Sequence, residues 1–375
     1  MVKTKWKRVC NDSLSTLLIL CTSPSLHSHR AHAAEAVPSH LARPCSNIRL
    51  DAPGGPFENY QFESQGDVGD CYAFMSAKLT DAWRFKNGID QRQSSGFASA
   101  MIISANDPLS RDLDGNFGCD ALLWAVEHGG CSFKSVTERM GGRDPKVADE
   151  LGRLLKLYRK VDRHGALYSE KKLDRMEGKI CRVAKKLLGP AGDEEMEKCN
   201  ILDSTSQSTG TKFIYDLLLK EGCSLPENQL KISSPLMKVK WDVVDRCDTG
   251  PVSTHDLFHI KSLPKKEAAF FAQKGALDAI DTALLDTKPA GIGFCATFLR
   301  KPGSVGINWN GDRYSPDLAT CGGHAAAVIG RRKEKEKCQY LIYNSWEVRA
   351  GDGGKQWVDA DDLARNLMQV YRLRY

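Results

Sequence analysis

The sequence lacks the marks of several common protein classes. It contains no C-x-x-C pair, so it predicts neither a zinc ribbon nor a thioredoxin-like redox site. Beyond residue 33 no segment approaches about 18 consecutive apolar residues, so we expect no membrane span. Internal repeats and long low-complexity tracts are also absent. What remains, 41% hydrophobic and 27% charged residues in a chain of 375, is typical of a globular protein with one large domain or two ordinary ones.

The chain also lacks a strong excess of one charge. The chain carries 53 Lys and Arg against 47 Asp and Glu, a formal net charge of +6. Most of this excess falls in residues 1–33, whose charged side chains are Lys3, Lys5, Lys7, Arg8, Arg30 and the single acidic Asp12. The remainder is close to neutral, so we expect no nucleic-acid partner.

Residues 1–33 have the layout of a secretory signal peptide. A basic beginning is followed by a short apolar run at residues 15–21 and by an A-x-A site at residues 31–33. The sequence therefore predicts cleavage near Ala33 or Ala36 and a protein that is secreted or periplasmic.

Cysteine usage also indicates export. Of thirteen cysteines, Cys10 and Cys21 belong to the leader, and the eleven that remain are an odd number. In an oxidising compartment they permit five disulfides and one free thiol, and Cys71 is our candidate for the free one. The sequence leaves the connectivity open.

The stretch Q-G-D-V-G-D-C-Y-A-F at residues 65–74 places Cys71 at the start of a predicted helix. Two glycines break the chain just before the cysteine, and the apolar residues that follow can lie on one side: Ala73, Phe74, Ala77 and Trp83. Backbone N–H groups and the positive end of the helix dipole converge at a helix start and favour thiolate over thiol. The alternative interpretation is a buried or disulfide-bonded cysteine.

Periodicity predicts the other elements. We expect an extended segment at 34–64, helices at 65–85, 121–128 and 268–286, charged amphipathic helices between 144 and 219, and strands at 291–298, 324–329, 339–344 and 354–358. Residues 97–104 fit either period, and 303–312 are typical of a glycine-rich loop. The basic faces of the charged helices are interpreted as solvated outer faces, the alternatives being a membrane or nucleic-acid surface.

Two motifs partly match metal sites. Residues 112–116, D-L-D-G-N, resemble the opening of a calcium loop, but Phe117 and Leu123 replace the glycine and the glutamate that such a loop needs. His255 and His259 have the spacing of a metal pair, without a glutamate between them or an evident third ligand. We therefore predict no metal and no cofactor.

A histidine and an asparagine end up close together if two predicted strands pair. His324 begins a small-residue apolar strand, and Asn344 follows an alternating strand twenty residues later. A hairpin of these strands would place the two side chains side by side. Each residue taken alone is more often structural, a satisfied histidine and a turn asparagine.

Three motifs in order, Q-G-x-x-G-x-C-Y-A-F, then G-G-H-A, then N-S-W followed by G-D-G-G, resemble those of the papain-like cysteine peptidases, the family of papain and the cathepsins. The resemblance covers residues 65–124 and 276–357. It implies an α+β fold of two lobes, helical at 65–139 and β-rich at 267–375, with an extra mainly helical insertion at 140–266.

The resemblance also implies a role for each matching residue. Cys71 would be the nucleophile, His324 its imidazolium partner, and Asn344 the group that orients the imidazole. Gln65 would donate its amide to the oxyanion together with the Cys71 N–H, and Trp346 would cover the His–Asn hydrogen bond. The implied substrate-binding residues are Gly69, Gly118, Gly323 and Trp346.

The sequence departs from the family's pattern at several positions. Val68 replaces a cysteine that normally bridges to the segment of Cys119, so Cys119 needs another partner, for which Cys131 is the candidate. Residues 120–121 stand where the family has Asn or Ser and paired glycines that let the backbone approach the substrate. Asp70 directly precedes the nucleophile, and an adjacent carboxylate works against thiolate formation.

The leading interpretation is therefore an exported, monomeric cysteine peptidase that acts on a protein or peptide substrate through an acyl-enzyme. Residues 34–64 are too few to supply the family's helical propeptide, so the insertion at 140–266 is expected to act as a lid, an exosite or a docking surface for a protein partner. The alternatives are an acyltransferase with the same dyad and a catalytically silent binding or inhibitory module.

Overall fold

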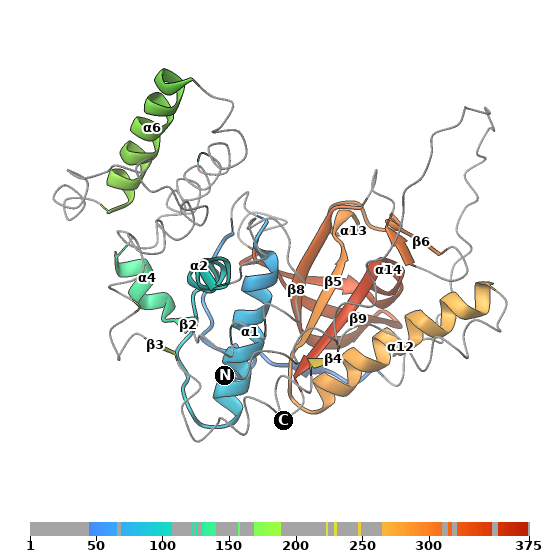
Figure 1. The fold of residues 1–375 in the computed structure, drawn as a ribbon. Coiled ribbons are helices and arrows are strands. Elements are labelled where there is room, and N and C mark those ends of the chain that lie inside the picture. The colour runs from blue at the N-terminus through green and yellow to red at the C-terminus, as the bar shows by residue number, and fades with distance from the viewer. Residues whose placement is uncertain are drawn as a thin grey trace, which may run out of the picture. The chain divides into compact units, whose positions relative to one another are not determined.

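The computed structural model describes residues 45–65, 69–106, 122, 125, 130–139, 157, 169–188, 223, 229–230, 247–248, 265–309, 314–316, 321–346 and 352–373. The predicted leader, the calcium-like motif at 112–116, the pair His255 and His259, and most of the insertion at 140–266 lie outside these residues. Within them, helices are combined with an antiparallel sheet, as the predicted α+β class requires (Figure 1).

One large sheet dominates the described residues. Its strand order is β10-β9-β8-β5-β11-β4, with β1 paired to β8, and every pair is antiparallel. The strands are β1 (Ile48–Arg49), β4 (Cys247–Asp248), β5 (Ala290–Cys295), β8 (Gly323–Glu334), β9 (Lys337–Tyr343), β10 (Lys355–Asp359) and β11 (Leu367–Leu373). Two short ribbons pair β2 (Gly130–Cys131) with β3 (Gln229–Leu230) and β6 (Ile307–Trp309) with β7 (Tyr314–Pro316).

Strands β8 and β9 form the hairpin that the sequence predicts. Lys335 and Glu336 make its two-residue turn with φ angles of 47° and 65°, the left-handed conformation that matches the twist of paired strands. Ala327 pairs with Tyr343, and the register shifts between Val328 and Gly330. The hairpin therefore carries the beginning of β8 and the end of β9 to the same end of the sheet.

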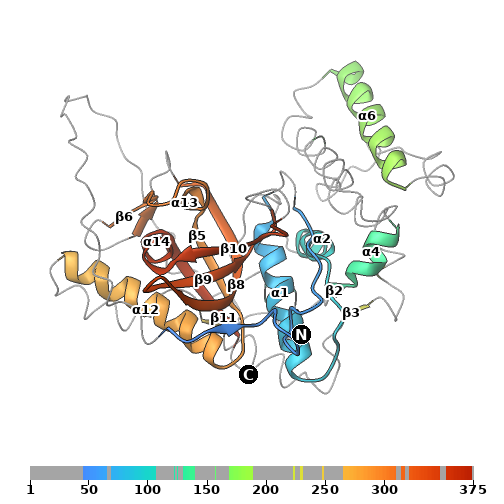
Figure 2. The ribbon, with the colours of Figure 1, turned by 180° about the vertical axis from the view of Figure 1, so that it is seen from behind.

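The described helices are α1 (Cys71–Lys86), α2 (Gly96–Asn106), α4 (Phe133–Arg139), α6 (Glu170–Leu188), α12 (Lys265–Leu285), α13 (Thr297–Arg300) and α14 (Ala360–Asn366). Helices α1, α6 and α12 confirm sequence predictions. Residues 97–104, whose pattern fits either a helix or a strand, belong to helix α2. Residues 307–309, predicted as loop, form β6, and α14 and β11 follow the last predicted strand. Helices α1 and α12 pack against the sheet from different sides (Figures 1 and 2).

Helix α1 is buried on every side rather than along one stripe. All residues from Tyr72 to Arg84 are buried, because the helix packs against β5 and β8 and also against α2. A glycine permits the close approach to the sheet: a Cβ at Gly291 would lie 2.7 Å from the sulfur of Met75 and 2.9 Å from Cδ1 of Leu79. The first residue of this helix, Cys71, is thus held by the core of the domain.

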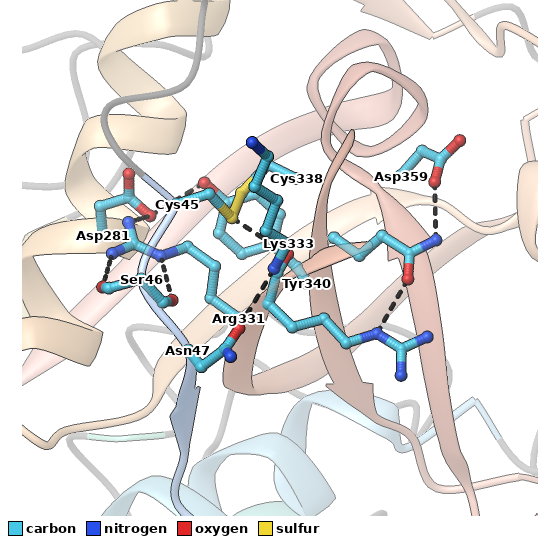
Figure 3. Close-up of a disulfide and its surroundings, with 11 residues drawn as sticks. Cys45, Ser46, Asn47, Asp281, Arg331, Lys333, Cys338, Tyr340 and Asp359 are labelled. Atoms are coloured by element: carbon cyan, nitrogen blue, oxygen red, sulfur yellow. Dashed lines mark hydrogen bonds and ion pairs between the residues drawn. A yellow bond between two sulfur atoms is a disulfide. The ribbon is translucent and has the colours of Figure 1, made fainter. Parts of the chain in front are cut away.

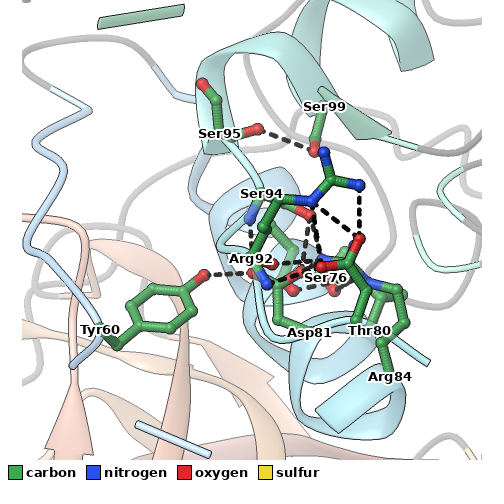
Figure 4. Close-up of polar contacts among 11 residues, drawn as sticks. Tyr60, Ser76, Thr80, Asp81, Arg84, Arg92, Ser94, Ser95 and Ser99 are labelled. Carbon is green, nitrogen blue, oxygen red and sulfur yellow. Dashed lines mark hydrogen bonds and ion pairs between the residues drawn. The ribbon is translucent and has the colours of Figure 1, made fainter. Parts of the chain in front are cut away.

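A buried carboxylate, Asp81, joins α1 to the segments on either side of it (Figure 4). Its Oδ2 accepts hydrogen bonds from the Tyr60 hydroxyl at 2.8 Å and the Ser94 N–H at 2.7 Å, while Oδ1 accepts one from the Ser94 hydroxyl at 2.6 Å. Arg84, one turn further along the helix, forms an ion pair with the same carboxylate. These bonds fix the chain just before Gln65 and the start of α2 relative to α1.

The chain that precedes α1 is tied to strands β8 and β9 of the large sheet (Figure 3). Strand β1 pairs with β8, and a disulfide joins Cys45 to Cys338 at the start of β9. The Asn47 side chain accepts a hydrogen bond from the Lys333 N–H at 3.2 Å. Part of the predicted extended segment at 34–64 therefore belongs to the sheet.

A buried ion pair joins Arg331 on β8 to Asp281 on α12, and its loss should destabilise the protein strongly. Arg331 and Asp281, each with 2% of its side chain exposed, approach to 2.5 Å, and the Tyr340 hydroxyl donates to the same carboxylate at 2.9 Å (Figure 3). The change Asp281→Ala leaves a buried guanidinium without its counter-charge, so we expect a loss of about 3–5 kcal/mol in the free energy of unfolding.

Urea or thermal unfolding measures this loss. The matched control is Glu334→Ala, which removes a half-exposed carboxylate 3.9 Å from Arg332 and should cost less than about 1 kcal/mol. Equal effects of the two changes would contradict the assigned role of Asp281.

Three disulfides are described, namely Cys45–Cys338, Cys131–Cys223 and Cys295–Cys321, and Cys181 is also disulfide-bonded. Such bonds form in oxidising compartments. The predicted partnership of Cys119 with Cys131 is wrong, because Cys131 on β2 bonds to Cys223, 92 residues later. Among the helices that the structure describes, none combines the length and apolar character needed to cross a bilayer.

Candidate active site

Cys71 is the first residue of α1 and carries the one free thiol among the described cysteines. The prediction of a free thiol at a helix start is confirmed. Its side chain packs against an apolar cluster that contains Ala325, whose backbone N–H lowers the pKa of the thiol. Ala325 directly follows His324 on β8, so the start of the helix lies against the strand that carries the histidine.

His324 and Asn344 are brought together by the β8–β9 hairpin. The Nε2 of His324 lies 2.5 Å from the Oδ1 of Asn344. The same Oδ1 accepts the Ser345 N–H at 2.9 Å, which identifies it as the amide oxygen. Because an oxygen accepts here, Nε2 carries the imidazole proton, and the lone pair of Nδ1 is the acceptor of the ring.

Aromatic rings enclose the imidazole. The Trp346 ring centroid lies 4.9 Å from that of His324, and the indole N–H is 3.4 Å from Nδ1. Phe294 on β5 contacts the ring edge-on at a centroid distance of 5.5 Å. His324 is therefore buried, and its orientation is fixed by hydrogen bonds to both ring nitrogens and by ring packing around it.

Gln65 joins the same group of residues through Ser345. Its backbone N–H donates to the Ser345 carbonyl at 2.7 Å, and its side-chain Oε1 accepts a hydrogen bond from the Ser345 hydroxyl. This leaves the amide nitrogen as the donor end of a buried side chain. Ser345, which the sequence analysis did not single out, thus connects Gln65 to Asn344.

Of the predicted substrate-binding residues, two lie beside the histidine. Gly323 precedes His324, is exposed, and has open space where a Cβ would stand; Trp346 packs on the ring. Gly69 lies two residues before Cys71, and Gly118 lies outside the described residues.

Burial sets the protonation of the two reactive groups. Desolvation raises the pKa of the Cys71 thiol to about 11, the Asp70 carboxylate adds to the rise, and the Ala325 N–H opposes it. Desolvation lowers the pKa of His324 to about 4, against the bond to Asn344. Burial therefore favours the neutral thiol of Cys71 and the neutral imidazole of His324. The sequence prediction of a thiolate and an imidazolium at rest goes in the opposite direction, whereas the expected effect of Asp70 is present.

Sequence reasoning missed a buried lysine, Lys78, and a partly buried glutamate, Glu63, near the site. Lys78 on α1 is 5% exposed, and its ammonium lies 4.9 Å from the ring centroid of Tyr343, the residue before Asn344. Glu63 accepts hydrogen bonds from the Ser95 hydroxyl at 2.7 Å and the Gly96 N–H at 2.6 Å. The two charges attract each other, and that of Lys78 disfavours the imidazolium form of His324. Nothing in the spacing of these residues distinguishes them from surface charges.

Asn344 offers a test of how the imidazole is oriented. We expect Asn344→Ala to lower kcat/KM for peptide hydrolysis roughly 100-fold, because the ring loses the acceptor that fixes its tautomer. The matched control is Asn366→Ala: Asn366 is equally buried and bonded, but to Gly306 and Ser304. Steady-state kinetics should separate the two variants. A comparable loss in the control would mean that Asn344 acts through stability alone.

Among the residues that the structure describes, no group of three or more His, Cys, Asp or Glu side chains is arranged to hold a metal ion.

No protein-family model matches the chain, and no curated protein does. Solved structures of papain-like cysteine proteases are similar to it. Xylellain, a cysteine protease from Xylella fastidiosa, is 12% identical with a TM-score of 0.39, over 94% of this chain and 95% of that one. SERA5E from Plasmodium falciparum is 13% identical with a TM-score of 0.42, over 86% and 93%. PepW from Lactobacillus rhamnosis is 15% identical with a TM-score of 0.42, over 89% and 83%.

Proposed function

We propose that this chain is an exported cysteine peptidase that hydrolyses peptide bonds with Cys71 as its nucleophile. The observation that carries the proposal is the arrangement of a free thiol at the start of α1 against the strand of a histidine whose far nitrogen is bonded to Asn344. A nucleophile, a base and a residue that orients the base are the parts that acyl transfer requires.

The first half of the reaction forms an acyl-enzyme. Nδ1 of His324 exchanges its contact with the indole for the thiol and accepts the thiol proton, which creates the thiolate and imidazolium. The sulfur attacks the carbonyl carbon, and the resulting oxyanion accepts hydrogen bonds from the Gln65 amide and the Cys71 N–H. As the C–N bond breaks, the imidazolium returns its proton to the leaving amine.

The second half releases the acid. Water attacks the thioester while His324 takes one of its protons, the C–S bond breaks, and that proton returns to the sulfur. Throughout, Asn344 keeps the ring in one tautomer, Trp346 shields their hydrogen bond, and the open space at Gly323 lets a substrate backbone approach. Gly69 and Gly118 are proposed to line the same groove.

Two lobes and an insertion are proposed. Residues 65–139 form a helical lobe, residues 267–375 form a β-rich lobe, and the groove between them holds the substrate. Residues 1–33 are a cleaved leader, and the disulfides support export. The insertion at 140–266 acts as a lid, exosite or partner-docking surface on a monomeric enzyme. Its deletion should change activity on peptide or protein substrates.

One observation favours a second candidate, a catalytically silent relative used for binding or inhibition. Burial and Asp70 hold the thiol in its unreactive protonated form. Such a module would neither cleave peptides nor react with an alkylator faster than an ordinary thiol.

Cleavage of a fluorogenic peptide library before and after alkylation tests the proposal. We expect purified wild-type protein to cleave part of the library, one equivalent of a peptide-like alkylator to abolish cleavage, and peptide mapping to place the label on Cys71. Cleavage that persists with Cys71 fully labelled would rule out the proposed nucleophile, and absence of both cleavage and labelling would favour the silent module.

The pH dependence should follow from the neutral resting pair. His324 must be uncharged to accept the thiol proton, so kcat/KM should fall as the pH drops through about 4, the pKa of the buried imidazole. Without substrate, alkylation of Cys71 by a small neutral reagent should instead rise steadily with pH toward about 11. A fast alkylation plateau between pH 5 and 8 would contradict this and indicate a resting ion pair.

A further inference from the structure

The short helix α13 is anchored beside His324. It follows β5, whose last residue, Cys295, is disulfide-bonded to Cys321 and pairs with Gly323. The Ala296 N–H donates to the Gly322 carbonyl at 2.8 Å. Phe298 on α13 packs against Phe294 at a ring distance of 5.9 Å, and Phe294 contacts the imidazole. These bonds and contacts fix α13 relative to the histidine.

The last residue of α13 is an exposed arginine placed over the tryptophan of the site. The guanidinium carbon of Arg300 lies 5.3 Å from the ring centroid of Trp346, and that ring lies 4.9 Å from the imidazole. In the described part of the chain, Arg300 makes no ion pair or hydrogen bond. This cation–π contact holds the guanidinium at the indole and leaves its N–H groups available at the surface.

The chemistry of the reaction indicates which part of a substrate would meet this arginine. The imidazole gives its proton to the leaving amine, so it must lie on the C-terminal side of the scissile bond. Trp346 lies against the imidazole, the exposed Arg300 lies against Trp346, and Lys301, the next residue in the chain, adds a second exposed cation. The residues of the substrate that follow the scissile bond would therefore meet a positive surface.

We propose that Arg300 determines specificity by binding a carboxylate on the leaving-group side of the scissile bond. This inference rests on the proposed peptidase function. The carboxylate belongs either to an acidic side chain one or two residues after the bond or to the C-terminus of a short leaving peptide. A planar guanidinium forms paired N–H···O bonds with either, and at an exposed site such a bond changes binding by about tenfold.

Matched peptides test the proposal. One series carries Glu or Gln at the first or second position after the cleaved bond, with an amidated C-terminus. The other series has Gln at that position as its last residue, and its C-terminus is either a free carboxylate or an amide. We expect wild type to favour the carboxylate member of at least one pair by about tenfold in kcat/KM, with the preference shrinking at high salt. The pair that shows the preference identifies the source of the carboxylate.

Variants assign the preference to Arg300. The ratio of kcat/KM between the carboxylate peptide and its uncharged partner should fall to about one in Arg300→Gln. It should be partly kept in Arg300→Lys, which retains the charge. Arg332→Gln is the matched control. Arg332 lies on β8, eight residues beyond His324, and its guanidinium carbon is 4.3 Å from the ring centroid of Trp357. Its loss should leave the preference for the carboxylate peptide intact. Wild type that cleaves every pair equally would overturn the role of Arg300 while the peptidase function stands, whereas no cleavage of any peptide would overturn both.

Discussion

Replacing Cys71 by alanine is expected to lower kcat/KM for peptide hydrolysis by at least about 10⁴-fold. The sulfur forms the covalent bond that divides the reaction into two easier steps, so no other side chain of the site can replace it. The loss should appear in kcat, because the residues proposed to bind the substrate are unchanged. Kinetics with a peptide selected from the library would measure it, together with thermal unfolding to show that the variant is folded.

Ser76→Ala is the matched control for the Cys71 change. Ser76 is buried on the same helix, and its hydroxyl donates to the Tyr72 carbonyl at 2.8 Å. Its removal disturbs the packing of α1 without touching the thiol, so activity should stay within a few-fold of wild type. A folded Cys71→Ala protein that retained wild-type hydrolysis would refute the proposed chemistry.

Replacing His324 by alanine should cost roughly 10³- to 10⁴-fold in kcat/KM, and it should change the pH profile. Without the imidazole no buried base takes the thiol proton, and no acid protonates the leaving amine. The residual activity should then follow the thiolate fraction and rise with pH toward the thiol pKa of about 11, because hydroxide becomes the base. Wild type should lack that continued rise.

The His324→Ala variant also distinguishes the loss of the base from a loss of folding stability. His324→Ala leaves a space between Phe294 and Trp346, so its unfolding temperature should drop while the protein stays folded. Added imidazole should restore part of the activity by entering that space. Activity of His324→Ala that matched wild type across pH would show that another group serves as the base.

The candidate residues could be predicted because each is marked by local sequence. Glycines before Cys71 and helical spacing after it predict a helix start, and α1 begins there. Small and alternating apolar residues predict two strands whose hairpin brings His324 and Asn344 together, as the structure shows. Hydrophobic periodicity and turn residues depend only on neighbouring positions in the chain, so they can be recognised in a single sequence.

Properties that arise from packing could not be predicted. The charge states of Cys71 and His324 depend on desolvation by the surrounding core, which outweighs the effect of a helix start on the thiol. The bond from Cys131 to Cys223 joins residues 92 positions apart, and no local pattern encodes it. Arg300 is one of many basic residues until the anchored α13 places it over Trp346.

Intact-protein mass spectrometry of an acid-quenched reaction tests the central claim most directly. Wild type mixed with an activated ester of a short peptide should gain the mass of one acyl group within a turnover, carry it on Cys71 by peptide mapping, and lose it to water as the product acid appears. His324→Ala should acylate far more slowly. An adduct on another residue, or continued hydrolysis with no adduct at any time, would contradict a thioester at Cys71.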